Sequence, residues 1–144
     1  MATSSSWFFW AALSAVFAAL TASFAKVGIR DVDSDLATLI RTFIIIIVLS
    51  CFVWFAGKWS NPFVFSPKTW GFLGLSGLAT GLSWVCYFRA LQIGDASKVA
   101  PVDKFSLVLV AIFAFVFLDE RPSLRDWLGI AFVASGVVIL AIKR

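Results

Sequence analysis

The chain has 144 residues, of which 61% are hydrophobic, and a formal net charge of +4. Its mean hydropathy is +0.97. Soluble domains contain about 45–50% apolar residues, so this composition excludes the soluble globular class and predicts an integral membrane protein. A bilayer crossing takes about 20 residues, which leaves room for five crossings.

Five apolar segments, taken in chain order, predict five transmembrane helices. No positively charged residue precedes the first, and its apolar run exceeds the roughly 7–15 residues of a signal-peptide core, so we expect it to stay in the membrane. A barrel strand would alternate polar and apolar residues, whereas these segments are apolar on all sides. We predict an all-α membrane protein with one domain over residues 1–144. The predicted spans are residues 7–25, 36–57, 70–93, 98–118 and 123–142.

The segments between the spans carry the charges and turn-forming residues that lipid excludes. They read KVGIRDVDSD, GKWSNPFVFSPKT, GDASK and DERPS. Ser123 closes the last of them and stands three residues before Asp126, so its hydroxyl is expected to cap the fifth helix. Glu or Gln is more usual than Asp at that third position.

The sequence lacks the residues that carry common catalytic chemistry. It has no histidine, no phosphate-binding loop, no dinucleotide fingerprint and no clustered metal ligands. Cys51 and Cys86 fall in different spans, which favours buried apolar thiols over a disulfide or a metal pair. We expect no enzymatic activity, no cofactor, no metal and no nucleic-acid partner.

Small residues at helical spacing predict close packing, because glycine and alanine let membrane helices approach each other. Gly77 and Gly81 form a GxxxG pair in the third span, and Gly129 and Gly136 lie in the fifth. Two interpretations stand. These faces pack within one chain, or they form a seam between two copies.

Several charged residues lie inside the spans at a similar depth. Because successive crossings alternate in direction, Arg41, Arg89, Asp103 and Lys104 all fall roughly 6–9 Å inside the same membrane face. They predict a net positive polar layer, where an unpaired charge costs about 2.5–3.5 kcal/mol on insertion scales. This cost favours a functional role. The alternative is that arginine and lysine extend to the headgroups along their own stems.

Asp103 differs from the three cations, because its side chain is too short to reach water from that depth. Its carboxylate needs a nearby cation or a water-filled cavity. Lys104 points about 100° away around the helix, so we expect the partner of Asp103 to be Arg41 or Arg89. Such a pair would shape a cavity, or it would be purely structural.

Pro101 predicts an irregularity in the fourth span. It cannot donate to the carbonyl of Ser97, so it kinks the helix or leaves its first turn irregular. In transporters, broken helix ends mark binding sites. The alternative is a proline that simply begins the helix.

The C-terminal part of the chain carries an ordered set of motifs. YFRALQIG is followed by ASKVAPVDK, then by FLDERPSLRDWLG, then by a small-residue apolar span that ends in VVIL. Residues 86–142 thereby resemble the EamA domain of the drug/metabolite transporter superfamily, and the number and spacing of the earlier spans agree. Most members contain two five-helix repeats of opposite orientation, and this chain has one. The resemblance therefore implies a homodimer, which must be antiparallel to reproduce the inverted repeat.

The resemblance also implies a secondary carrier that moves a small metabolite or drug-like molecule across the bilayer. We expect alternating access around a cavity lined by the third and fourth spans, with Asp103 as the candidate for proton exchange. The positive layer favours an anionic or zwitterionic substrate. The candidate substrate-binding residues are Arg41, Trp84, Tyr87, Arg89, Asp103 and Lys104.

Lysine and arginine in the loops and at the ends are nearly balanced between the two membrane faces, which permits dual topology. Adding the cations inside the spans favours one orientation instead. One face has Lys58, Lys68, Arg121 and Arg125, and the other has Lys26, Arg30, Lys98, Lys143 and Arg144.

Two other functions stay open. The first is a small multidrug exporter of the same superfamily, which would bind cationic apolar compounds through acidic and aromatic groups. The second is a non-transporting membrane subunit or assembly factor, which would use its small-residue faces only to hold a partner.

Overall fold

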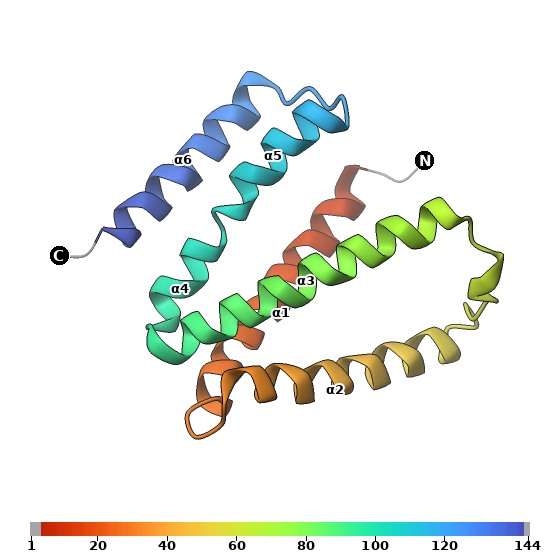
Figure 1. Cartoon of the computed structure of the whole chain (residues 1–144). Coiled ribbons are helices and arrows are strands. Elements are labelled where there is room, and N and C mark those ends of the chain that lie inside the picture. The colour runs from red at the N-terminus through yellow and green to blue at the C-terminus, as the bar shows by residue number, and fades with distance from the viewer. Residues whose placement is uncertain (1–3, 143–144) are drawn as a thin grey trace. The chain divides into compact units, whose positions relative to one another are not determined.

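The computed structural model describes residues 4–142 and is helical, with no strand in that range. Five helical stretches are long and apolar enough to cross a membrane, so the predicted all-α membrane class is confirmed (Figure 1). The fourth crossing consists of two helices, α4 and α5. The elements are α1 (Ser4–Gly28), α2 (Ser34–Phe55), the 3-10 turn η1 (Pro62–Val64), α3 (Pro67–Ile93), α4 (Ala96–Asp103), α5 (Ser106–Phe117) and α6 (Leu124–Ala141).

Polar side chains in the connecting segments determine where two of the helices begin. Asp33 caps α2, because its carboxylate accepts hydrogen bonds from the backbone N–H groups of Asp35 and Leu36, both at 3.0 Å. Ser123 and Asp126 form a reciprocal capping box at the start of α6. The predicted cap is therefore confirmed, and the shorter Asp serves where Glu or Gln is usual.

The chain divides into two compact units, residues 1–93 and residues 94–144. In the first unit, α3 packs against both α1 and α2. Its buried residues gather at one end, where α1 finishes, α2 begins and α3 finishes. We call this the tied end. Toward Phe55 and Pro67, α2 and α3 separate (Figure 1), and the side chains there are exposed. The buried residues are Ala22, Ile29, Ser34, Thr38, Phe88 and Leu91.

In the second unit, α6 packs against both halves of the fourth crossing. Ala114 of α5 and Val137 of α6 are its buried apolar residues. Pro101 lies inside α4, five residues after the helix begins, and so does not start it. After Pro101 the backbone bonds shorten to the i to i+3 pattern, for example from the N–H of Lys104 to the carbonyl of Pro101 at 3.0 Å, and α5 begins only at Ser106.

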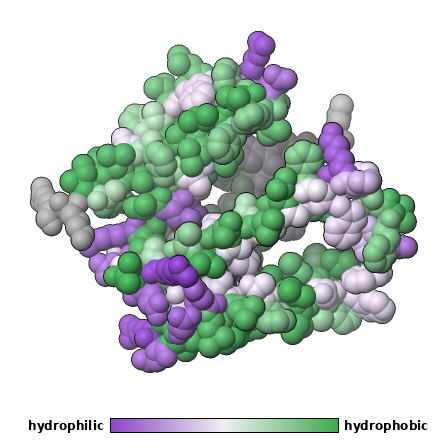
Figure 2. Space-filling view, in the orientation of Figure 1, coloured by the Kyte–Doolittle hydropathy of each residue, from purple (hydrophilic) through white to green (hydrophobic). Residues whose placement is uncertain are grey.

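Most of the surface of both units is apolar, as expected of helices surrounded by lipid. Hydrophobic residues cover much of the face shown in Figure 2, and hydrophilic residues form smaller groups there. Cys51 and Cys86 are both exposed. The prediction of buried thiols was therefore wrong, because it assumed that an apolar residue within a span faces protein, whereas in a membrane it can equally face lipid.

Candidate functional site

Arg41 crosses from α2 to the aromatic face of α3. Its guanidinium carbon lies 4.8 Å from the ring centroid of Trp84 and 4.6 Å from that of Phe88. The two aromatic residues are one helical turn apart and therefore share a face of α3. Both distances lie within the roughly 6 Å reach of a cation–π interaction. The guanidinium is thus held against two rings.

Thr38 and Thr42, which are close to Arg41 in the sequence of α2, direct their hydroxyl hydrogens to backbone carbonyls. The hydroxyl of Thr38 donates to the carbonyl of Ser34 at 2.7 Å, and the hydroxyl of Thr42 donates to the carbonyl of Thr38 at 2.8 Å. Among the described residues, the Nη1 atom of Arg41 is buried and has no hydrogen-bond partner. A buried donor without an acceptor is destabilising, so this atom has capacity for a further bond.

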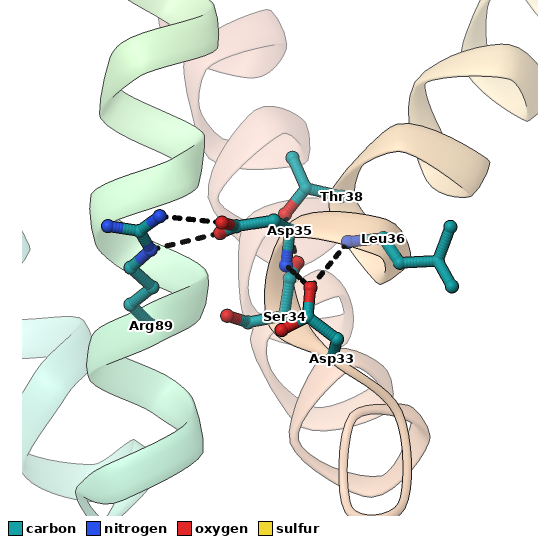
Figure 3. A network of polar contacts seen from close by, with 6 residues as sticks. All are labelled: Asp33, Ser34, Asp35, Leu36, Thr38 and Arg89. Atoms are coloured by element: carbon teal, nitrogen blue, oxygen red, sulfur yellow. Dashed lines mark hydrogen bonds and ion pairs between the residues drawn. The ribbon is translucent and has the colours of Figure 1, made fainter.

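Arg89 of α3 makes a two-pronged ion pair with Asp35, which lies in the first turn of α2 (Figure 3). Its Nε donates to Oδ1 at 2.9 Å, and its Nη2 donates to Oδ2 at 2.6 Å. This bidentate geometry fixes the orientation of both side chains as well as their distance. The pair joins the start of α2 to the last turns of α3.

Two further hydrogen bonds hold the same tied end. The ammonium group of Lys26 in α1 donates to the carbonyl of Leu91 at 2.6 Å, and the side-chain amide of Gln92 donates to the carbonyl of Val32 at 3.0 Å. The last turn of α3 is therefore bonded both to α1 and to the loop that leads into α2.

In the second unit, Asp103 pairs with its neighbour Lys104, with Nζ and Oδ2 3.3 Å apart. We expected Arg41 or Arg89 in that role, and such a pair between the two units stays a prediction; within the first unit, Arg89 pairs with Asp35 and Arg41 lies on aromatic rings. The prediction considered only the directions of the two Cα–Cβ bonds. The four-carbon stem of lysine is flexible enough to bring its ammonium group back around the helix.

The structure brings together part of the predicted site. Arg41 meets Trp84, and Tyr87 makes an edge contact with Phe88, with ring centroids 6.1 Å apart. Asp103 and Lys104 belong to the other unit, and their membership of one layer with Arg41 stays a prediction.

Two residues of the site, Phe88 and Asp35, were not predicted from the sequence. The spacing of Phe88, four after Trp84, could have pointed to it. Asp35 was assigned to a connecting segment because it precedes the apolar run.

The predicted packing glycines lie on free helix faces. A Cβ atom built at Gly77, Gly81, Gly129 or Gly136 would meet no atom within 4 Å among the described residues. A role for these faces in contacts with another chain stays a prediction.

A small cavity of about 320 Å³ lies elsewhere in the second unit, at the turn after α5. It is lined by Phe115, Asp119, Arg121 and Pro122. None of the predicted site residues lines it.

The apolar helices and the polar groups set among them define a multi-pass integral membrane protein. Residues 5–142 match the EamA-like transporter family. The chain belongs to this family, so the predicted resemblance is confirmed and the protein is a membrane transporter by class.

A relative from Sinorhizobium sp is 57% identical over 139 residues, which cover 96% of this chain and 99% of the relative. It is described as "Uncharacterized transporter in cobO 3'region". A second relative, from Yersinia pestis (strain Pestoides F), is 32% identical over 69 residues, which cover 48% of this chain and 60% of the relative. It is described as "Probable 4-amino-4-deoxy-L-arabinose-phosphoundecaprenol flippase subunit ArnE". No solved structure matches the chain.

Proposed function

We propose that this protein is a secondary carrier for a small metabolite or drug-like molecule, and that it works by alternating access. The asymmetry of residues 4–93 carries the proposal. Side-chain bonds hold α1, α2 and α3 together at the tied end, and α2 and α3 separate toward the other. An alternating-access carrier needs helices that are joined at one membrane face while they are apart at the other.

Uptake by the purified protein in proteoliposomes tests this proposal. A panel of radiolabelled amino acids, organic acids, nucleosides and amphipathic cations would be offered with and without a proton gradient. We expect protein-dependent accumulation of at least one class above empty liposomes. Leakage equal to that of empty liposomes for every class, together with co-purification of a different membrane protein, would favour the non-transporting subunit instead.

We further propose that two copies form the complete carrier as an antiparallel homodimer. The family resemblance implies paired five-helix repeats, and one chain supplies five crossings. The free faces at Gly77 and Gly81 would let a second copy approach closely. The Yersinia relative is described as a subunit, which supports a paired arrangement in this family.

Labelling of a single cysteine tests the antiparallel orientation. In a Cys51→Ala/Cys86→Ala background, Ser60→Cys places one thiol in the exposed α2–α3 loop. We expect a membrane-impermeant maleimide applied to intact cells to label about half of the molecules, because nearly balanced lysine and arginine permit both orientations. Labelling of permeabilised cells, in which both membrane faces are accessible, gives the total number of reactive thiols. Labelling of all or none of the molecules would contradict the antiparallel dimer.

A further inference from the structure

Arg41 is a positive charge inside a membrane-spanning segment, and residues 4–93 supply no carboxylate to pair with it. The ion pair of that unit is Arg89 with Asp35, in which both carboxylate oxygens are used. The buried Nη1 of Arg41 also has no hydrogen-bond partner in the part of the chain described. A cation in this state is costly in a bilayer unless something completes its bonding.

The position of the guanidinium argues against simple extension to the headgroups. Arg41 lies about 10 Å along α2 from Ser34, whereas Trp84 and Phe88 lie about 13 Å and 7 Å along α3 from Ile93. A side chain that extended to the membrane surface would pass the level of Phe88 toward the tied end. The guanidinium instead stays within reach of both rings, 4.8 Å from the centroid of Trp84 and 4.6 Å from that of Phe88.

Cation–π stacking leaves the guanidinium able to recognise an anion. The rings contact the guanidinium as an apolar surface and accept no conventional hydrogen bond, and Nη1 still has no hydrogen-bond partner among the described residues, so it is available to donate. A planar fork of donors matches a carboxylate or phosphate, which accepts two parallel hydrogen bonds. The two rings would also provide an apolar wall beside the anion.

We infer that Arg41 binds the oxyanion of the transported molecule, with Trp84 and Phe88 contacting its apolar or aromatic body. The substrate class is therefore a small organic anion with a carboxylate or phosphate group. This inference rests on the proposed carrier function and deepens it. The same chemistry is present in the phosphate of a lipid headgroup, so the experiment must separate a soluble anion from lipid.

Calorimetric titration of the full-length protein in phosphatidylcholine nanodiscs tests the inference, with phenylphosphate as the probe. Benzyl alcohol and benzylamine are matched neutral and cationic probes. We expect both to bind at least tenfold more weakly than phenylphosphate. Equal or tighter binding of benzylamine would overturn the inference and favour a carrier of cationic compounds.

Substitutions distinguish specific binding of the anion by Arg41 from nonspecific attraction to a positively charged protein. We expect Arg41→Gln to weaken phenylphosphate binding at least tenfold, and Arg41→Lys to weaken it less, because lysine keeps the charge but lacks the planar fork. Trp84→Leu should also weaken it. Arg30→Gln removes an exposed arginine outside the site and should leave the affinity unchanged. Far-UV circular dichroism checks that each variant is folded. If Arg41→Gln does not fold, the affinity of Arg41→Lys decides the test.

Nanodiscs that contain phosphatidylglycerol distinguish the source of the anion. At 0.5 M salt, which screens the surface charge of the lipid, we expect the Arg41-dependent affinity for phenylphosphate to be the same in these nanodiscs as in phosphatidylcholine nanodiscs. A tenfold loss there would assign the site to lipid phosphate and overturn the inference.

The uptake and binding measurements test the carrier function and the Arg41 site separately. Uptake by the wild type with phenylphosphate affinity unaltered in Arg41→Gln would end the inference and leave the carrier. Arg41-dependent binding with no flux for any panel compound would end the carrier and leave the site.

Discussion

Reversing the charge of Arg89 is expected to reduce uptake at least tenfold. Arg89→Asp would place a second carboxylate against Asp35, where a bidentate ion pair now joins α2 to α3. Near the membrane face this repulsion is less screened than in bulk water. The helices at the tied end should therefore separate. A carrier whose helices are apart at both membrane faces at the same time lets its substrate leak back, so it cannot accumulate it.

A thiol probe reports the separation directly. Ser34 is only 3% exposed at the tied end, so Ser34→Cys in the Cys51→Ala/Cys86→Ala background should react slowly with a maleimide. We expect at least tenfold faster labelling when Arg89→Asp is added. Lys98→Asp disrupts an exposed ion pair within the second unit and serves as the matched control.

Exchanging the two charges provides the rescue. Asp35→Arg combined with Arg89→Asp restores opposite signs, so labelling should slow again and uptake should return in part. Full recovery is not expected, because the exchange places a cation in the first turn of α2 and an anion near the C-terminus of α3, both unfavourable for the helix dipoles. Unaltered uptake and labelling in Arg89→Asp would rule out a role for this pair in closing the tied end.

Replacing Asp103 with asparagine is expected to abolish gradient-driven uptake while substrate exchange continues. Asparagine keeps the size of the side chain and cannot ionise, so a step that loads and releases a proton would be lost. The break after Pro101 places Asp103 at the last position of α4, where the backbone is irregular. Irregular backbone at membrane depth is characteristic of coupling sites in transporters.

The measurement compares proton-driven uptake with exchange of the panel compound that shows the highest flux. Asp95→Asn is the matched control, because Asp95 also pairs with a lysine, Lys98, at 3.1 Å, but lies before α4 in the connecting segment. Gradient-driven uptake equal to wild type in Asp103→Asn would eliminate Asp103 as the coupling residue, and an equal loss in Asp95→Asn would make the effect nonspecific.

The positions of individual helices followed closely from composition. Long runs without charge, separated by segments such as GDASK and DERPS, located all five crossings to within three residues at each end. The helices run slightly past several predicted limits, as at Lys26 in α1, because polar side chains at a helix end can reach the membrane surface. The break in the fourth crossing was also expected, since proline lacks the N–H that a continuous helix requires.

The pairing of charges could not be obtained in the same way. Arg89 was correctly identified as a charged residue within a span, but its partner was sought among the other charges inside the spans, and Asp35 was left in a connecting segment. The two residues are 54 positions apart, so their contact depends on how α2 and α3 are rotated against each other. Spans that are apolar on all sides contain little information about that rotation.

The sequence by itself determined the membrane class, the five crossings, the family resemblance and which charged residues fall within the apolar spans, because these follow from local composition and order. The tertiary structure alone decided which side chains meet: Arg41 with Trp84 and Phe88, Arg89 with Asp35, and Asp103 with Lys104. Such contacts depend on helix rotation and side-chain direction. In a bilayer, where every face of a helix can be apolar, hydrophobic patterning does not specify them.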